Sequence, residues 1–191
     1  MAMSEAEWDQ GMELAGYLER MQLNAPTWRQ NLQETNLEEF GPQLKRVEGL
    51  LAGGRVRAAV FSEPWCGDCM ENVPVVGRLA QEMPGLEVRV FSRESDLMQR
   101  YLTGGKAIIP TVVFFLPGGP ELCRFIERPA AAHAFLASAA REAAGLEEPL
   151  GQEHLRRAKR QLRELYRQGL RSETAREILD ALEGALARME A

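Results

Sequence analysis

Two cysteines stand three residues apart in the segment Trp65-Cys66-Gly67-Asp68-Cys69. The segment follows an apolar run typical of a buried strand and opens a helical pattern, so the two sulfurs would lie one helical turn apart, within disulfide range. Unpaired backbone N–H groups and the helix dipole favour a thiolate at Cys66, because such settings lower a cysteine pKa from about 8.5 to between about 3.5 and 7.5. The pattern predicts thiol–disulfide exchange, with Cys66 as nucleophile and Cys69 as resolving thiol.

Two other interpretations of the cysteine pair are open: unreactive core residues, or ligands of zinc or of an iron–sulfur cluster. A metal site normally needs a second cysteine pair or suitably spaced histidines. The chain has only His133 and His154, neither near a cysteine in the sequence, and the third cysteine, Cys123, stands alone. We therefore predict no metal and no organic cofactor. Cys123 is expected to be a small buried hydrophobe, with a second redox or regulatory thiol as the alternative.

The elements that would position the motif alternate between strand and helix patterns. The predicted strands cover residues 57–62, 86–92, 111–116 and 121–127. The predicted helices between and after them cover residues 66–83, 95–102 and 129–145. This order predicts an α/β fold with a four-stranded mixed sheet flanked by helices.

Helical patterns occupy both ends of the chain. We expect residues 1–56 to form a helical segment packed on a core of residues 57–147, and residues 148–191 to form an appended helical hairpin. The helices expected in these end segments are Glu5 to Met21, a helix capped by Asn36 and ending at Leu51, and residues 152–168 and 172–189, split at Gly169.

A second short motif, Ile109-Pro110-Thr111, begins the strongest strand pattern, 44 residues after Cys66. Proline at the first position of a strand has a structural explanation, because it need not donate to the ladder. Together, however, Trp-Cys-Gly-x-Cys after a strand and Ile-Pro-Thr before another at this interval resemble the thioredoxin family. The resemblance covers roughly residues 55–145. The helical N-terminus is similar to that of bacterial thioredoxin-like proteins with an added helical segment.

The resemblance implies a thioredoxin fold in which Cys66 is the nucleophile, Cys69 resolves, and the peptide bond before Pro110 is cis. It also implies that the backbone of Ile109 pairs with an extended substrate segment beside the sulfurs. Trp65 is a candidate docking aromatic next to the nucleophile, and packing against the core is its alternative.

Two departures from the family concern proton handling and redox potential. Thioredoxin has a buried aspartate in the strand before the motif, and Val60 stands at the matching position here. Gly67-Asp68 replaces the central Gly-Pro. We expect the Asp68 carboxylate to disfavour a thiolate on Cys66, and so to push the couple towards a reducing potential.

Charge gives little reason to expect nucleic acid, since the formal net charge is −5. Seven cations nevertheless crowd into a short stretch, and we expect them on a solvated helix face, with docking of an acidic partner or nucleic acid as the alternative. They are Arg156, Arg157, Lys159, Arg160, Arg163, Arg167 and Arg171. The N-terminus lacks the pattern of a signal peptide, and the longest apolar run is too short to span a bilayer. We therefore expect a cytoplasmic protein without membrane contact.

The prediction that combines these observations is a thiol–disulfide oxidoreductase. It would reduce disulfide-containing proteins or small-thiol substrates through Cys66 and Cys69, and an external reductant, such as a thioredoxin reductase or a low-molecular-weight thiol, would regenerate the dithiol. The alternative is a binding or adaptor module, in which the thioredoxin-like core is a scaffold and the terminal helices recruit a partner.

Overall fold

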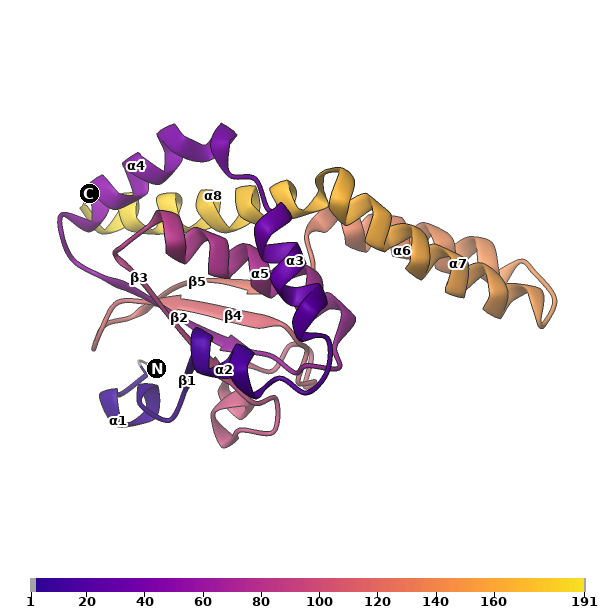
Figure 1. Ribbon diagram of the computed structural model, residues 1–191, viewed down its shortest axis with the longest axis horizontal. Helices are drawn as coiled ribbons and strands as arrows, with labels where there is room; N and C mark the ends of the chain where they lie inside the picture. Colours follow the sequence, from indigo (N-terminus) through magenta and orange to yellow (C-terminus); the bar gives the residue numbers. More distant parts are fainter. Residues whose placement is uncertain (1–2, 191) are drawn as a thin grey trace.

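The computed structural model describes residues 3–190 and shows a mixed five-stranded sheet with helices on both faces (Figure 1). The strand order is β1-β3-β2-β4-β5, with β2 and β3 parallel and the other neighbours antiparallel. The strands are β1 (Met12–Glu13), β2 (Val56–Phe61), β3 (Leu86–Phe91), β4 (Thr111–Phe115) and β5 (Glu121–Ile126). The predicted fold class is confirmed, with one strand more than the four expected.

Helices surround this sheet and extend beyond it. Those of the first half are α1 (Glu5–Trp8), α2 (Leu14–Arg20), α3 (Ala25–Glu34), α4 (Gly41–Leu51), α5 (Gly67–Glu82) and the 3₁₀ helices η1 (Glu38–Phe40) and η2 (Asp96–Tyr101). Those of the second half are α6 (Ala130–Ala144), α7 (Leu150–Leu165), the π-helical turn η3 (Tyr166–Leu170) and α8 (Arg171–Glu190). None of the helices within residues 3–190 combines the length and the apolar character that a bilayer-spanning segment requires.

The two faces of the sheet are covered differently. Helices α5 and α8 lie on one face, where α3 packs on α5 and α4 packs on α8 (Figure 1). On the other face Trp8 of α1 meets Phe115 edge-on, with ring centroids 5.5 Å apart. There the ring of Phe61 also lies 5.3 Å from that of Tyr101 in η2. Side chains alternate between the two faces of a sheet along each strand. Every residue of β4, and every residue of β2 except Arg57, is buried, so both faces of these central strands are covered.

The prediction of one helix from Glu5 to Met21 is wrong. A capping box of Ser4 and Glu7 starts α1, which ends at Trp8, and the chain then pairs with β3 through Met12 and Val90 before α2 begins. Gly11 permits this close approach, because a Cβ atom there would lie 2.5 Å from the Phe91 ring. The apolar spacing matched a helix, but its residues bury themselves against the sheet edge instead.

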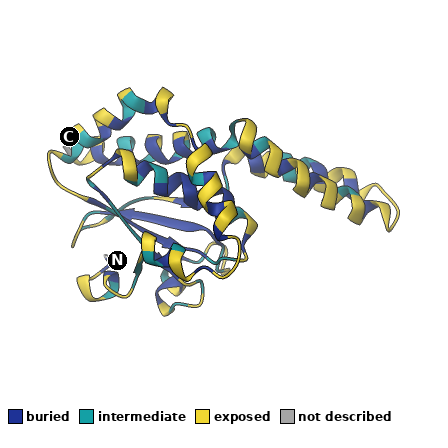
Figure 2. Cartoon of the chain, in the orientation of Figure 1, coloured by how far each residue is buried: buried dark blue, intermediate teal, exposed yellow. Residues whose placement is uncertain are grey.

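The expected hairpin of residues 152–168 with 172–189 is also not formed, although the predicted break at Gly169 is present. Helix α7 pairs with α6 instead, and the two project from the body as an arm with a mostly exposed surface (Figure 2). Small and apolar side chains hold the arm together, among them Ala132, Leu162 and Tyr166. Helix α8 returns to the main core because its apolar face is broad enough to cover α5 and β5, with Ala175, Ile178, Leu179, Leu182 and Leu186 buried.

Candidate active site

The cysteine motif lies where β2 ends and α5 begins. Cys66 has an extended backbone and is the N-cap of α5, as predicted, and its sulfur accepts a hydrogen bond from the backbone N–H of Cys69 at 3.3 Å. The sulfur therefore satisfies one of the donors that a helix N-terminus leaves unpaired. This contact favours negative charge on Cys66.

Both cysteines are free thiols, and their closest atoms lie 3.1 Å apart. Hydrogen bonds from the thiol and backbone of Cys69 lower the pKa of Cys66, against the opposing effect of burial. Burial raises the pKa of Cys69 well above its usual value, and its hydrogen bond to Cys66 adds to this. Cys66 retains 8% exposure and Cys69 none. Of the two thiols, Cys66 is therefore the more acidic and the more accessible.

The second motif lies against the first. The Cys66 thiol donates to the carbonyl oxygen of Ile109, with 3.6 Å between sulfur and oxygen, and the Ile109–Pro110 peptide bond is cis. The Pro110 carbonyl accepts from the backbone N–H of Glu127, 2.7 Å away, which ties this loop to the end of β5. The structure thus brings together the two segments that are 44 residues apart in the sequence.

An exposed apolar edge adjoins Cys66. Trp65 is 59% exposed, so the alternative of a core-packed tryptophan is wrong. The loop before α3 meets this edge, because the Asn24 side-chain amide donates to the Pro64 carbonyl at 2.8 Å, and the neighbouring Leu23 is also exposed. The N-terminal segment therefore contributes to the rim of the site, a contact that local sequence patterns did not indicate.

Asp68 is held by Arg128 rather than facing solvent alone. The guanidinium donates to both carboxylate oxygens, at 3.0 and 2.6 Å, and also to Glu127 at 2.6 Å. The Asp68 charge raises the pKa of Cys66, as the sequence suggested, while its backbone N–H lowers it. Arg128 offsets the charge of Asp68 at a position that the sequence analysis missed, since 60 residues separate the two. Gly67 lies between Cys66 and Asp68, and a Cβ atom added there would meet no other atom within 4 Å.

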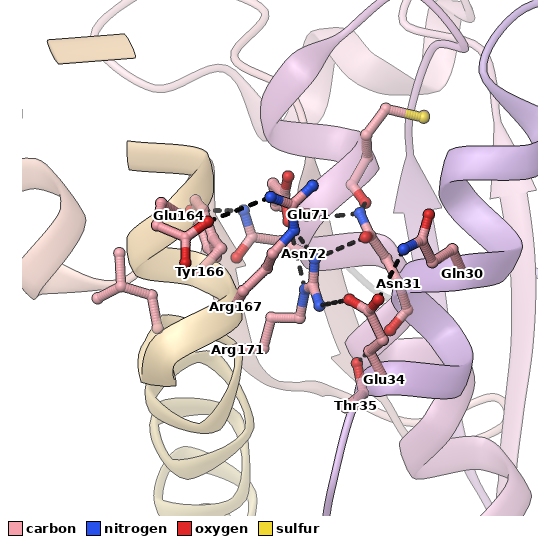
Figure 3. Close-up of polar contacts among 12 residues, drawn as sticks. Gln30, Asn31, Glu34, Thr35, Glu71, Asn72, Glu164, Tyr166, Arg167 and Arg171 are labelled. Atoms are coloured by element: carbon pink, nitrogen blue, oxygen red, sulfur yellow. Dashed lines mark hydrogen bonds and ion pairs between the residues drawn. The ribbon is translucent and has the colours of Figure 1, made fainter. Parts of the chain in front are cut away.

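A buried network of polar side chains fastens α5 to α3 and α8 behind the motif (Figure 3). Arg171 donates to Asn31 at 2.6 Å and to Glu71 at 2.9 Å, and the Thr174 hydroxyl donates to Asn72 at 2.7 Å. All five side chains are almost fully buried. Because Glu71 and Asn72 follow Cys69 on α5, the network fixes the helix that carries both cysteines.

The expectation that Arg171 lies on a solvated face is therefore wrong, since it is 5% exposed. The other six cations of its stretch are exposed, as predicted. Cys123 lies half-buried in β5, packed against the main core, and burial raises its pKa to about 12. That thiol is far less acidic than Cys66. Among the side chains of residues 3–189, no group of three or more His, Cys, Asp or Glu could hold a metal ion.

Comparison with known proteins agrees with this architecture. A family model described as thioredoxin matches residues 11–141. The crystal structure of a protein of unknown function from Pseudomonas aeruginosa is 25% identical, with a TM-score of 0.66 over 97% of this chain and 99% of that chain. An HIV epitope-scaffold structure is 23% identical, with a TM-score of 0.64 over 95% and 98% of the two chains, and shows likeness of fold alone. No curated protein matched the chain.

Proposed function

Because the chain belongs to the thioredoxin family, we propose that it is a thiol–disulfide oxidoreductase that reduces disulfides through Cys66 and Cys69. The observation that carries the proposal is the cysteine pair itself. Two free thiols in contact at a helix N-terminus have pKa values displaced in opposite directions, lowered at Cys66 and raised at Cys69. With these pKa values Cys66 can attack as a thiolate while Cys69 stays protonated until the second step.

In the first step the Cys66 thiolate attacks one sulfur of the substrate disulfide. A bond forms between Cys66 and that sulfur, the substrate S–S bond breaks, and the other substrate sulfur leaves as a thiolate that takes up a proton. Trp65 offers an apolar contact beside the nucleophile, and the backbone of Ile109, which precedes the cis Pro110, offers its polar groups to an extended substrate segment. Gly67 and Asp68 would tune the redox couple from within the motif.

In the second step Cys69 loses its proton and attacks the Cys66 sulfur. The Cys66–Cys69 bond forms as the mixed disulfide breaks, and the second substrate sulfur leaves as a thiolate. Two electrons have passed from the dithiol to the substrate. An external reductant, either a thioredoxin reductase or a low-molecular-weight thiol, returns them. A cytoplasmic setting suits this direction, because glutathione and thioredoxin keep thiols reduced there.

Reduction of insulin in the presence of dithiothreitol tests the proposal. We expect the protein to accelerate precipitation of the insulin chains and Cys66→Ser to abolish the acceleration. With insulin alone, after dithiothreitol has been removed, we expect Cys69→Ser to accumulate a mixed disulfide visible by mass spectrometry. Cys123→Ser is the matched control and should retain the activity, because that thiol is half-buried in another strand. A protein no faster than dithiothreitol alone, or full activity in Cys66→Ser, would contradict the proposal.

One observation favours the binding-module alternative. The α6–α7 arm projects from the body (Figure 1), and five exposed cations of α7 form no ion pair with the side chains of residues 3–189. They are Arg156, Arg157, Lys159, Arg160 and Arg163. If recruitment through the arm were the whole function, replacing both motif cysteines with serine would leave function in the cell intact.

A further inference from the structure

The two segments of the candidate site meet through a weak contact. The Cys66 thiol donates to the Ile109 carbonyl with 3.6 Å between sulfur and oxygen, and a thiol is a poor donor. The next residue, Pro110, is tied more firmly to the end of β5, because its carbonyl accepts from the backbone N–H of Glu127 at 2.7 Å. Whatever holds Glu127 against the start of α5 therefore also sets where the Ile109 backbone lies relative to the Cys66 sulfur.

Glu127 has a backbone conformation that has to be held in place. Its φ is 66°, in the left-handed region that side chains other than asparagine and aspartate rarely adopt. Such a conformation persists only where surrounding contacts offset its cost. Besides the N–H bond to Pro110, the Glu127 carboxylate accepts from Arg128 at 2.6 Å, and the Glu127 carbonyl accepts from the Asn72 side chain at 3.2 Å.

The Asn72 amide joins this residue to the cysteine motif. Its nitrogen also donates to the Asp68 carbonyl at 2.9 Å and to the Tyr166 hydroxyl at 2.9 Å, and its oxygen accepts from Thr174 at 2.7 Å. Two N–H groups thus serve three acceptors, so one of them is shared. The opposite orientation of the amide would turn its oxygen towards two carbonyl oxygens, so these contacts define which way it faces.

We propose that Asn72 is a positioning residue of the proposed reaction. Its amide clamps the backbone of Glu127 to that of Asp68. The clamp thereby holds the Ile109 backbone beside the Cys66 sulfur, where a protein substrate meets both. The inference rests on the proposed function and concerns the alignment of such a substrate with the nucleophile.

A second link between the same two residues runs through their side chains, and it is the more exposed one. Arg128 donates to the carboxylates of Asp68 and Glu127, and its side chain is 16% exposed. Asn72 is 1% exposed. Water can therefore replace much of what Arg128 supplies, whereas loss of the Asn72 amide leaves two backbone carbonyls without this donor in a buried setting. The amide is thus the stronger determinant of how the two segments are aligned.

Two reactions of the reduced protein, measured after dithiothreitol has been removed, test the clamp. Single-turnover reduction of insulin uses both the Cys66 sulfur and the Ile109 backbone, whereas alkylation by iodoacetamide needs the sulfur alone. We expect Asn72→Leu to slow insulin reduction about tenfold or more, because a misplacement of about 1 Å can cost about a hundredfold, and to leave the alkylation rate of Cys66 unchanged. Leucine keeps the branching of the side chain and removes its polar groups. Asn72→Ala, which leaves room for water at the two carbonyls, is the second variant in case Asn72→Leu does not fold.

Two controls separate the clamp from a general loss of packing. Tyr166→Phe removes one partner of Asn72 but leaves two N–H groups for the two backbone carbonyls, so both rates should be retained. Val47→Ala removes buried methyl groups from α4, which packs on α8. It should lower the melting temperature and leave both rates unchanged.

Glu127→Gly gives a sharper test of what the clamp holds. Glycine adopts a positive φ without steric cost, so residue 127 would then depend less on Asn72. In a double-mutant cycle, Asn72→Leu should therefore slow insulin reduction less in the Glu127→Gly background than in the parent. A packing defect at Asn72 would have the same effect in both backgrounds.

Four results would overturn the inference. They are insulin reduction at the parent rate in a folded Asn72 variant, equal slowing of insulin reduction and alkylation, equal slowing by Val47→Ala, and an equal effect of Asn72→Leu in both backgrounds. A parent protein that does not reduce insulin would instead refute the proposed function, and the inference with it.

Discussion

Arg171→Met removes a buried guanidinium from the network between α3, α5 and α8 and leaves Glu71 without its cation. The Arg171 side chain is 6% exposed and that of Glu71 is 11% exposed, and their nitrogen and oxygen atoms lie 2.9 Å apart. The same guanidinium also donates to Glu34 at 3.0 Å and to Asn31. The substitution therefore leaves two carboxylates and one amide oxygen without this donor, and methionine fills much of the vacated volume.

Removing one member of a buried ion pair costs about 3–5 kcal/mol, because the remaining charge is neither solvated nor paired. At about 2–4 °C per kcal/mol for a chain of this size, we expect the melting temperature of Arg171→Met to fall by about 6–20 °C. Arg46→Met is the matched control. Arg46 pairs with Glu183 of α8 at 2.6 Å but is 57% exposed, and such pairs contribute about 0–1 kcal/mol.

The pH dependence of stability gives a second measurement. Burial raises the pKa of Glu71 in the folded protein, and loss of Arg171 should raise it further. The folded variant then holds this proton more tightly than the unfolded chain, so its stability falls as pH rises through the folded pKa. Urea unfolding should show a larger deficit at about pH 8 than at about pH 5. A deficit no greater than that of Arg46→Met, or one independent of pH, would refute the reasoning.

Three further outcomes can be checked directly. Alkylation at about pH 6.5 followed by mass spectrometry should label Cys66 before Cys69 or Cys123, because the pKa is lowered at Cys66 and raised at the other two thiols. Asp68→Asn should lower the pKa of Cys66 and raise its thiolate absorbance at that pH about threefold, because one charge at about 7 Å in water contributes ~0.6 kcal/mol. An unchanged absorbance would mean that Arg128 already cancels the charge of the carboxylate. Arg128→Gln should raise the pKa of Cys66 and lower the same absorbance, because Asp68 then lacks its counter-charge; an increase would contradict this.

Sequence patterns located the elements whose signals are local. Each of the strands β2 to β5 has an apolar run bounded by turn residues, and helix α5 has a cysteine at its N-cap, so the signal of each element lies within a few residues. Strand β1 has only two residues and exists because Met12 and Glu13 pair with β3. Nothing in its own composition distinguishes it from the helical pattern around it, so tertiary pairing decided its conformation.

The missed contacts of the site are all long-range. Asp68 and Arg128, Asn72 and Glu127, and Glu71 and Arg171 are separated by 60, 55 and 100 residues. A charge or amide in a single sequence carries no sign of which distant partner the fold will bring to it. The motif therefore located the two cysteines of the candidate site, whereas the side chains that surround them could be found only from the packed structure.

The return of α8 to the core has a consequence during protein synthesis. The chain emerges from the ribosome N-terminus first, and 100 residues separate Glu71, next to the cysteine motif, from Arg171 at the start of α8. At about 5–20 residues per second, α8 is made about 5–20 s after the motif. During that interval the nascent chain carries two thiols on a helix whose buried carboxylate has no cation and whose apolar face has no cover. Until α8 has been made, the helix that carries both cysteines therefore lacks the side chain that ties it to α3.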